Sequence, residues 1–256
     1  MKAVFFDVGG TLIHPWPSVG KIYAEVAKRH GITITPEQAE RAFRESWIEL
    51  KHDSTVAGPD ERRCSSSSMA ASQAQCGLTV SRKDWWRELV FRALDHRNEA
   101  CFEELFAVFS RAQAWRLYPD ALDALRHARA SKLHVGVISN WDERLRPLLD
   151  ELDVAKLLDS ITVSCEVGAE KPRPEIFRAA LEAAGVRPNE ALHVGDSSEE
   201  DVRGAEAVGM KGVLLERGGK AQAKSIADLR QFKLYLAGES PLNAQRKTTD
   251  CRADPV

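Results

Sequence analysis

Apolar runs and amphipathic stretches alternate through the second half of the chain. After residue 120 the sequence has helical spacing to about residue 130, followed by short apolar runs that alternate with further stretches of helical spacing. The predicted strands are 133–138, 160–164, 191–194 and 212–215, and the predicted helices between them are 142–151, 174–184 and 198–208. Strand and helix units of this length are typical of a parallel, doubly wound sheet with right-handed crossovers.

A further apolar run, Ala3–Phe6, lies near the start of the chain and ends in Asp-Val-Gly-Gly. A short continuous run that stops at a glycine turn is typical of a strand buried on both faces. This strand can join the later sheet only if the residues between them form an insert. Asp7 then lies at the carboxyl end of the first strand.

The interval from 15 to 116 has helical patterns in place of strand patterns. Residues 19–26 place their apolar side chains on one helical face, and Thr35-Pro36-Glu37-Gln38 has the residues of a helix N-cap. Helices are also predicted from about residue 81 and over 101–113. The serine-rich segment 52–77 is predicted to be a surface loop.

The sequence therefore predicts an α/β fold with a doubly wound (Rossmann-like) parallel sheet core and an inserted all-helical domain. The core would contain residues 1–14 and 117–238, and the insert residues 15–116. The polar segment 239–256 is predicted to be a flexible C-terminal tail.

Composition and charge narrow the range of partners. The net charge is −2 and the isoelectric point about 6.4, so no positive charge excess favours nucleic acid or an anionic membrane. A small molecule is the expected partner, and the chain is expected to be a monomer or a homodimer.

The five cysteines form no CxxC pair, which favours reduced thiols over a disulfide framework or a zinc site. The N-terminal apolar run is too short for a signal sequence or a membrane span, so a cytoplasmic protein is expected.

Polar residues follow the predicted strands at the points where ligands bind in such sheets. Asp7 follows the first strand, and Ser139-Asn140 follows the second. Lys171 comes after the third strand, and Asp196, with Asp201 five residues later, comes after the fourth. Since the carboxyl ends of parallel strands meet at one edge, these side chains are expected to converge there.

Each of these residue types has a use in phosphoryl transfer. A carboxylate such as Asp7 can attack phosphorus and form an aspartyl-phosphate, which divides hydrolysis into two easier steps. Mg²⁺ prefers oxygen ligands, so Asp7, Asp196 and a backbone carbonyl of the first loop could hold it. Ser139 and Lys171 could bind the remaining phosphoryl oxygens, where charge stabilisation has most effect.

Four segments together resemble a known family. FFDVGGTL, VGVISN, GAEKPRPEIF and HVGDSSEEDV are similar, in order and spacing, to the four motifs of the haloacid dehalogenase-like (HAD) hydrolase superfamily. The insert directly after the first motif is similar in position to the cap domain of that superfamily's subfamily I. The segments SNWDERL and RKDWWRELV resemble the branch named after a rhythmically expressed fly gene.

The resemblance implies a role for each strand-end residue. Asp7 would be the nucleophile, and Lys171 would assist it. The implied cofactor is Mg²⁺, held by Asp7, the backbone carbonyl of Gly9 and Asp196, with Asp201 orienting the metal's waters or Lys171. The residues predicted to bind the phosphoryl group are Thr11, Ser139, Asn140 and Lys171.

One position departs from the phosphatase pattern DxDxT, whose second Asp protonates the leaving group. This chain has Gly9 there, so the backbone carbonyl for the metal remains but the general acid/base does not. The loss of a proton donor typically costs about 10² to 10⁴ in rate. Activated substrates such as acyl phosphates tolerate that loss, and an acid from elsewhere could replace the missing one. His14 is the nearest candidate.

The sequence therefore predicts a Mg²⁺-dependent phosphatase of a small phosphorylated metabolite, acting through an aspartyl-phosphate. Two alternatives stay open: a dehalogenase-like or phosphonate C–P hydrolase, and a weakly or non-catalytic phospho-ligand-binding protein.

Some of these residues could instead have purely structural roles. Ser139-Asn140 could cap the next helix, and His193 is predicted to be a packed core residue. The tryptophans are predicted to form the core of the helical insert: Trp47, Trp85, Trp86 and Trp115.

Overall fold

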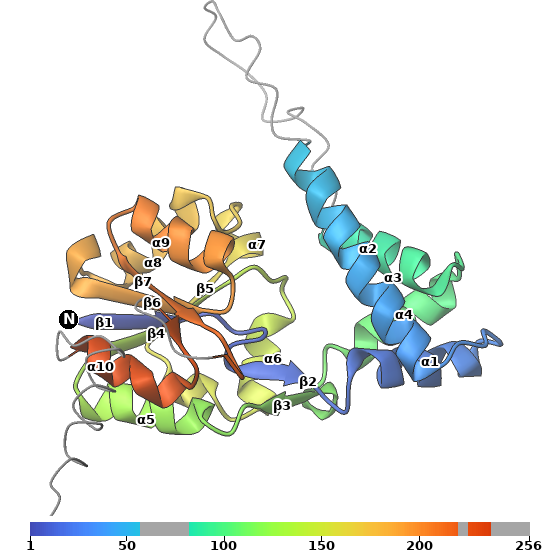
Figure 1. The fold of residues 1–256 in the computed structure, drawn as a ribbon, viewed down its shortest axis with the longest axis horizontal. Coiled ribbons are helices and arrows are strands. Elements are labelled where there is room, and N and C mark those ends of the chain that lie inside the picture. Colours follow the sequence, from blue (N-terminus) through green and yellow to red (C-terminus); the bar gives the residue numbers. More distant parts are fainter. Residues whose placement is uncertain (57–81, 220–224, 237–256) are drawn as a thin grey trace, which may run out of the picture. The chain divides into compact units, whose positions relative to one another are not determined.

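The computed structural model describes residues 1–56, 82–219 and 225–236 (Figure 1). The chain divides into two compact units. One unit contains Met1–Trp16 and Phe109–Val256, and the other contains Pro17–Val108. No helix in the described ranges is long and apolar enough to cross a membrane. The predicted C-terminal tail, 239–256, lies outside the described residues.

The first unit is built on a six-stranded sheet with the order β5-β4-β1-β6-β7-β8. Every pairing in this sheet is parallel. The strands are β1 (Ala3–Phe6), β4 (His134–Ser139), β5 (Ser160–Val163), β6 (Ala191–Gly195), β7 (Lys211–Leu215) and β8 (Ser225–Ile226). The first strand lies between β4 and β6, so the chain order reverses on either side of it. A crevice for ligands is expected at the carboxyl end of such a switch point.

Helices cover both faces of the sheet. In Figure 1, α8 and α9 lie on one face, and α5 and α10 lie on the other. The α-helices of this unit are α5 (Ala121–Ala130), α6 (Leu145–Glu151), α7 (Ser164–Val167), α8 (Pro174–Ala184), α9 (Gly204–Ala207) and α10 (Lys233–Leu236). Shorter helical turns are η1 (Ala112–Ala114), η2 (Ala155–Leu157), η3 (Pro188–Glu190), η4 (Ser198–Arg203) and η5 (Leu229–Phe232). The predicted α/β, doubly wound parallel sheet is confirmed.

The central strand is buried on both faces, as its continuous apolar run predicts. All four residues of β1 are buried. Phe5 belongs to a cluster with Ile176 and Phe177 of α8. Phe6 makes an edge-on contact with Phe232, with ring centroids 5.6 Å apart. Because successive side chains of a strand point to opposite faces, Phe5 and Phe6 anchor the strand to the two helical layers and fix the position of Asp7.

A two-stranded antiparallel ribbon also belongs to the first unit. It pairs β2 (Ile13–Pro15) with β3 (Trp115–Leu117). The ends of the interval predicted to be wholly helical are therefore strands, and the last predicted helix ends at Val108 instead of residue 113. Strands of three residues are too short to give a periodic signal, which explains the error.

The second unit is helical throughout its described part. Its helices are α1 (Val19–Arg29), α2 (Pro36–Val56), α3 (Arg82–Leu94) and α4 (Glu99–Val108). The predicted N-cap of α2 is confirmed by two hydrogen bonds. The backbone N–H of Gln38 donates to the Thr35 hydroxyl at 3.2 Å, and the side-chain oxygen of Gln38 accepts from the backbone N–H of Thr35 at 2.9 Å. Gly20 allows close contact between α1 and α2, because a Cβ there would lie 2.1 Å from the Pro36 carbonyl oxygen.

The prediction of a loop from residue 52 is wrong for its first residues, because α2 continues to Val56. The first residues that disfavour a helix, Gly58-Pro59, come only after that point. The remainder of the predicted loop lies outside the described residues. Three of the four tryptophans predicted to pack in the helical insert form one cluster there, with Trp47 in edge-on contact with Trp85 at 5.0 Å and Trp86 beside both. The fourth, Trp115, belongs to the sheet unit.

Candidate active site

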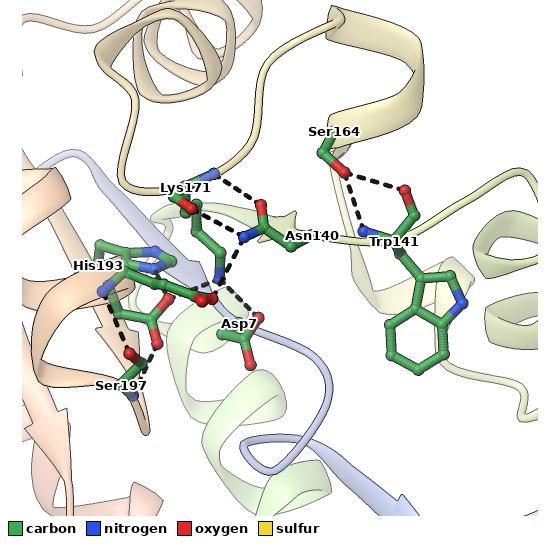
Figure 2. A network of polar contacts seen from close by, with 9 residues as sticks. Asp7, Asn140, Trp141, Ser164, Lys171, His193 and Ser197 are labelled. Atoms are coloured by element: carbon green, nitrogen blue, oxygen red, sulfur yellow. Dashed lines mark hydrogen bonds and ion pairs between the residues drawn. The ribbon is translucent and has the colours of Figure 1, made fainter. Parts of the chain in front are cut away.

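Lys171 joins two carboxylates at the carboxyl edge of the sheet. Its Nζ lies 2.7 Å from Oδ1 of Asp7 and 2.6 Å from Oδ1 of Asp201 (Figure 2). Asp7 follows β1, Asp201 belongs to η4, and Lys171 lies in the segment before α8. All three residues are buried, with Lys171 only 4% exposed. The structure therefore brings together three residues that the sequence placed at separate strand ends.

Asn140 holds the backbone of Lys171 in place. Its side-chain oxygen accepts from the Lys171 N–H at 2.7 Å, and its side-chain nitrogen donates to the Lys171 carbonyl at 2.9 Å (Figure 2). The same nitrogen lies 3.2 Å from Oε2 of Glu200. In this structure Asn140 thus positions the lysine that contacts Asp7. Its predicted contact with a phosphoryl group stays a prediction.

Asp201 is also held by His193, a residue whose contact the sequence did not indicate. His193 is fully buried, as predicted for a core residue, and its Nε2 lies 2.9 Å from Oδ1 of Asp201. The other carboxylate oxygen of Asp201 accepts from the Ser197 N–H at 2.9 Å. Since these partners fix the Asp201 carboxylate from two sides, its position is determined before any ligand binds.

Asp7, Asp196 and Asp201 form an acidic cluster. One carboxylate oxygen of each lies within 4.8 Å of the others. Asp196 is the exposed member and gives the cluster access to solvent. Two glycines allow this approach: a Cβ on Gly10 would lie 2.3 Å from Oδ2 of Asp196, and one on Gly195 would lie 2.1 Å from Cγ of Asp201. A side chain at either position would collide with a carboxylate of the cluster, which explains why both residues are glycine.

Burial and mutual repulsion shift the pKa values in this cluster. Burial raises the pKa of Asp7 to about 7, and Asp201 and Asp196 add to the rise although Lys171 opposes it. Burial and the charge of Asp201 also raise the pKa of Asp196. For Asp201, the nearby Lys171 and His193 outweigh burial and hold its pKa below the usual range. The pKa of Lys171 is raised despite its burial, because Asp201 and Asp7 stabilise the ammonium form.

The donor set of this cluster fits a divalent cation. Three carboxylates face the one ammonium group of Lys171, which leaves two negative charges in excess when all three are ionised. Hard oxygen ligands with one solvent-accessible side are what Mg²⁺ prefers, because it keeps several of its waters. The pKa of Asp7 is raised mainly by burial, and the charges of Asp201 and Asp196 add to that rise.

The two predicted hydroxyl residues, Thr11 and Ser139, are buried. Ser139 ends β4 and is 1% exposed, and Thr11 is fully buried in the loop after β1. The Thr11 hydroxyl makes no hydrogen bond to any of the described residues. Their roles in phosphoryl binding stay predictions.

The candidate acid His14 is engaged elsewhere. It belongs to β2, and its Nδ1 lies 3.0 Å from the Pro15 carbonyl oxygen. Its ring contacts those of Tyr118 and Trp16, with centroids 4.7 and 6.2 Å away. These contacts place His14 on the ribbon and do not connect it with Asp7.

Arg217 is a further residue near the first loop that the sequence did not indicate. Its guanidinium donates to the Thr11 carbonyl at 2.7 Å and to Oδ2 of Asp120 at 2.9 Å. It also lies 3.6 Å from the centroid of the Tyr118 ring. The three contacts link the end of β7 to the loop that carries Gly9 and Gly10, and so stabilise that loop.

Gly10→Ala is expected to destabilise the protein more than Gly168→Ala. Both glycines have positive φ, +82° and +76°, so each alanine brings a backbone penalty of about 1 to 2 kcal/mol. A Cβ on Gly168 meets nothing within 4 Å, whereas one on Gly10 meets Asp196. Urea unfolding of both variants isolates the steric term. Equal losses of unfolding free energy would contradict the close approach of Asp196 to the loop.

Comparisons with known proteins show the family to which the chain belongs. The family model described as "Hydrolase: haloacid dehalogenase-like hydrolase" matches residues 1–209. The chain belongs to the haloacid dehalogenase-like hydrolase family, and it is a hydrolase. The predicted family is confirmed.

Three curated relatives show where in the family the similarity lies. The mouse protein named haloacid dehalogenase-like hydrolase domain-containing protein 3 is 32% identical, over 84% of this chain and 82% of its own. The rhythmically expressed gene 2 protein of Drosophila melanogaster is 27% identical over the same shares, in agreement with the predicted branch. A phosphoserine phosphatase of Thermus thermophilus is 32% identical, over 93% of this chain and all of its own.

A solved structure has the same fold over nearly the whole chain. The HAD phosphatase of Thermococcus onnurineus is 25% identical and superposes with a TM-score of 0.62, covering 94% of this chain and all of that one. The similarity includes the helical residues after the first motif as well as the sheet.

Proposed function

We propose that this hydrolase is a Mg²⁺-dependent phosphatase of a small phosphorylated metabolite. The observation that carries the proposal is the buried group formed by Asp7, Lys171 and Asp201, with Asp196 at its open side. A carboxylate nucleophile, an ammonium group and an acidic cation site are the parts that phosphoryl transfer needs. Two similar proteins, a phosphoserine phosphatase and a HAD phosphatase, support the same activity.

In the proposed reaction an oxygen of Asp7 attacks phosphorus. The bond between phosphorus and the leaving oxygen breaks, and the leaving group departs with the bonding electrons. Water then attacks the phosphorus of the aspartyl-phosphate, which releases inorganic phosphate and restores Asp7. Lys171, fixed by Asn140 and Asp201, would neutralise charge on the phosphoryl oxygens. Ser139 and Thr11 would supply hydroxyl contacts.

The proposed ligands of Mg²⁺ are Asp7, the Gly9 carbonyl and Asp196, with Asp201 acting through water or through Lys171. When bound, the ion would offset the repulsion between the Asp7 carboxylate and the phosphoryl group. The position of Asp201 is set by His193 and Ser197, so it can orient neighbouring groups without moving itself.

Residues Pro17–Val108 are proposed to be the cap domain, which would enclose the substrate and decide its selection. They form a compact unit of their own and interrupt the sheet unit between β2 and β3. This is the arrangement expected of a domain inserted after the first motif.

The cation site predicts a Mg²⁺-dependent gain in stability. At a hundredfold excess over Kd, a ligand that binds the folded state stabilises it by about 2.7 kcal/mol. Asp196→Asn is expected to remove most of this gain and to raise the Mg²⁺ concentration needed for turnover. Glu199→Gln is the matched control, because Glu199 pairs with Arg203 outside the cluster. The measurement is thermal unfolding and turnover in a Mg²⁺ titration; equal responses of both variants would contradict the proposed ligand.

A panel of phosphorylated metabolites, acyl phosphates and a haloacid, assayed with and without Mg²⁺, tests the activity itself. The proposal expects phosphate release that a chelator abolishes, whereas halide release without metal would overturn it. Because Gly9 removes the usual proton donor, a phospho-ligand-binding protein with weak turnover is the second candidate. It predicts Mg²⁺ and phosphate binding with no catalysis that depends on Asp7.

A further inference from the structure

The indole of Trp141 lies where a side chain at position 9 would begin. A Cβ built on Gly9 would be 3.1 Å from Cζ3 of Trp141 and 3.9 Å from its Cη2. The first of these distances is short enough that the neighbour would have to move by a few tenths of an ångström. Gly9 is two residues beyond Asp7, and its neighbour Gly10 contacts Asp196. The indole edge therefore flanks the loop that follows the nucleophile and approaches Asp196.

Trp141 has little freedom to move aside. Its backbone N–H donates to the Ser164 hydroxyl at 3.1 Å, and that hydroxyl donates to the Trp141 carbonyl at 3.0 Å (Figure 2). Its ring contacts that of Trp115, with centroids 5.2 Å apart. Trp115 is itself fixed, since its indole N–H donates to the Phe109 carbonyl at 3.0 Å. Backbone and ring contacts together hold the indole against Gly9.

The position of the Trp141 side chain is related to the missing proton donor at Gly9. Gly9 provides no proton donor, and the Trp141 indole lies 3.1 Å from the point at which a side chain there would begin. An aromatic ring cannot protonate a leaving oxygen, but it gives an apolar surface against which a planar or acyl group can pack. The Gly9 and Trp141 pair thus favours a planar or acyl leaving group that needs no proton over one that must be protonated.

We propose that Trp141 is a specificity-determining residue, which excludes a proton donor at position 9 and selects acyl and aryl phosphates. In this reaction the oxygen of Asp7 bonds to phosphorus and the bond to the leaving oxygen breaks. The leaving group departs as a carboxylate or phenolate, both stable anions that need no proton. The inference rests on the proposed phosphatase function and deepens it.

The steric part is tested without any substrate. Gly9→Ala is expected to lower the midpoint of urea unfolding in the wild type and to have little effect in a Trp141→Ala background, because the neighbour is then absent. Trp141→Phe, which keeps a ring against Trp115, is expected to give an intermediate effect and serves if Trp141→Ala does not fold. Equal effects of Gly9→Ala in all three backgrounds would overturn the contact.

The functional part is tested by leaving-group dependence. Wild type, Gly9→Asp, Trp141→Ala and the double variant are assayed on acetyl phosphate and on aryl phosphates whose phenols range from acidic to weakly acidic. Trp141→Ala alone is expected to raise KM for the aryl phosphates about tenfold through loss of ring contact. Gly9→Asp alone is expected to lower kcat/KM for the weakly acidic phenols, because its side chain meets the Trp141 indole and strains the loop whose Gly9 carbonyl is a proposed Mg²⁺ ligand. The double variant is expected to raise it by about 10² relative to Trp141→Ala, since the new carboxyl has room to donate a proton.

Two results would overturn this inference while the phosphatase stands. One is a gain in Gly9→Asp as large as in the double variant, and the other is a wild-type rate that does not depend on phenol acidity. If no substrate shows turnover that depends on Asp7, the proposed function itself fails, and the inference fails with it.

Discussion

Asp7→Asn is expected to lower kcat by a factor on the order of 10⁴ or more, because a side-chain amide cannot act as the nucleophile in aspartyl-phosphate formation. The substitution preserves shape, and the Asn oxygen can still accept from Lys171, which in turn keeps its contact with Asp201. The measurement is kcat on an acyl phosphate at saturating Mg²⁺. A variant that retains a substantial part of the wild-type rate would show that another group attacks phosphorus.

The control for this variant is Asp159→Asn. Asp159 accepts from the Val135 N–H at 2.8 Å, next to the start of β4 at the opposite edge of the sheet from Asp7. Its replacement is expected to leave kcat within about twofold, because surface changes remote from a site have small effects. Asp7→Asn itself is expected to be at least as stable as the wild type without Mg²⁺. The raised pKa of Asp7 means that its ionised form is unfavourable in the folded protein, and Asn removes that charge.

Lys171→Ala is expected to have the largest effect on stability, a loss of about 3 to 5 kcal/mol, because removing one partner of a buried ion pair leaves the other charge unpaired. Here two carboxylates would lose the ammonium group that they share. Turnover is expected to fall as well, since no other ammonium group contacts Asp7 among the described residues. Urea unfolding at neutral pH, without added metal, measures the first effect.

Lys2→Ala is the matched control, because Lys2 also pairs with a carboxylate, that of Glu190, but its side chain is 67% exposed. An exposed pair contributes about 0 to 1 kcal/mol, so a small change is expected there. Lys171→Met, which keeps the apolar stem, separates the loss of charge from the loss of volume. If Lys171→Met were as stable as the wild type, the ion pair would not be what stabilises this edge of the sheet.

The sheet and the strand-end residues could be predicted because the signals are local. Each apolar run of β1, β4 and β6 ends in a polar residue, and parallel strands bring those ends to one edge. That reasoning places Asp7, Ser139 and Asp196 together without knowledge of any contact. Glycine turns and caps, such as the Thr35 and Gln38 pair, also depend on neighbours in sequence and were correctly predicted.

The remaining features depend on contacts between distant parts of the chain. Nothing in the local sequence shows that Arg217 binds the Thr11 carbonyl, or that the indole of Trp141 meets Gly9. The helix predicted over 198–208 is a π-helical turn, Ser198–Arg203, followed by α9. The turn carries Asp201 to Lys171 and His193, a constraint that helical periodicity does not reveal.

The covalent intermediate tests the central claim most directly. The protein is mixed with an acyl phosphate and Mg²⁺, quenched in acid within one turnover, digested and examined by mass spectrometry. The account predicts a peptide that contains Asp7 and carries the added mass of one phosphoryl group, labile at alkaline pH, and no such peptide from Asp7→Asn. Phosphate release without any modified Asp7 peptide, or with the phosphoryl group on another residue, would contradict it.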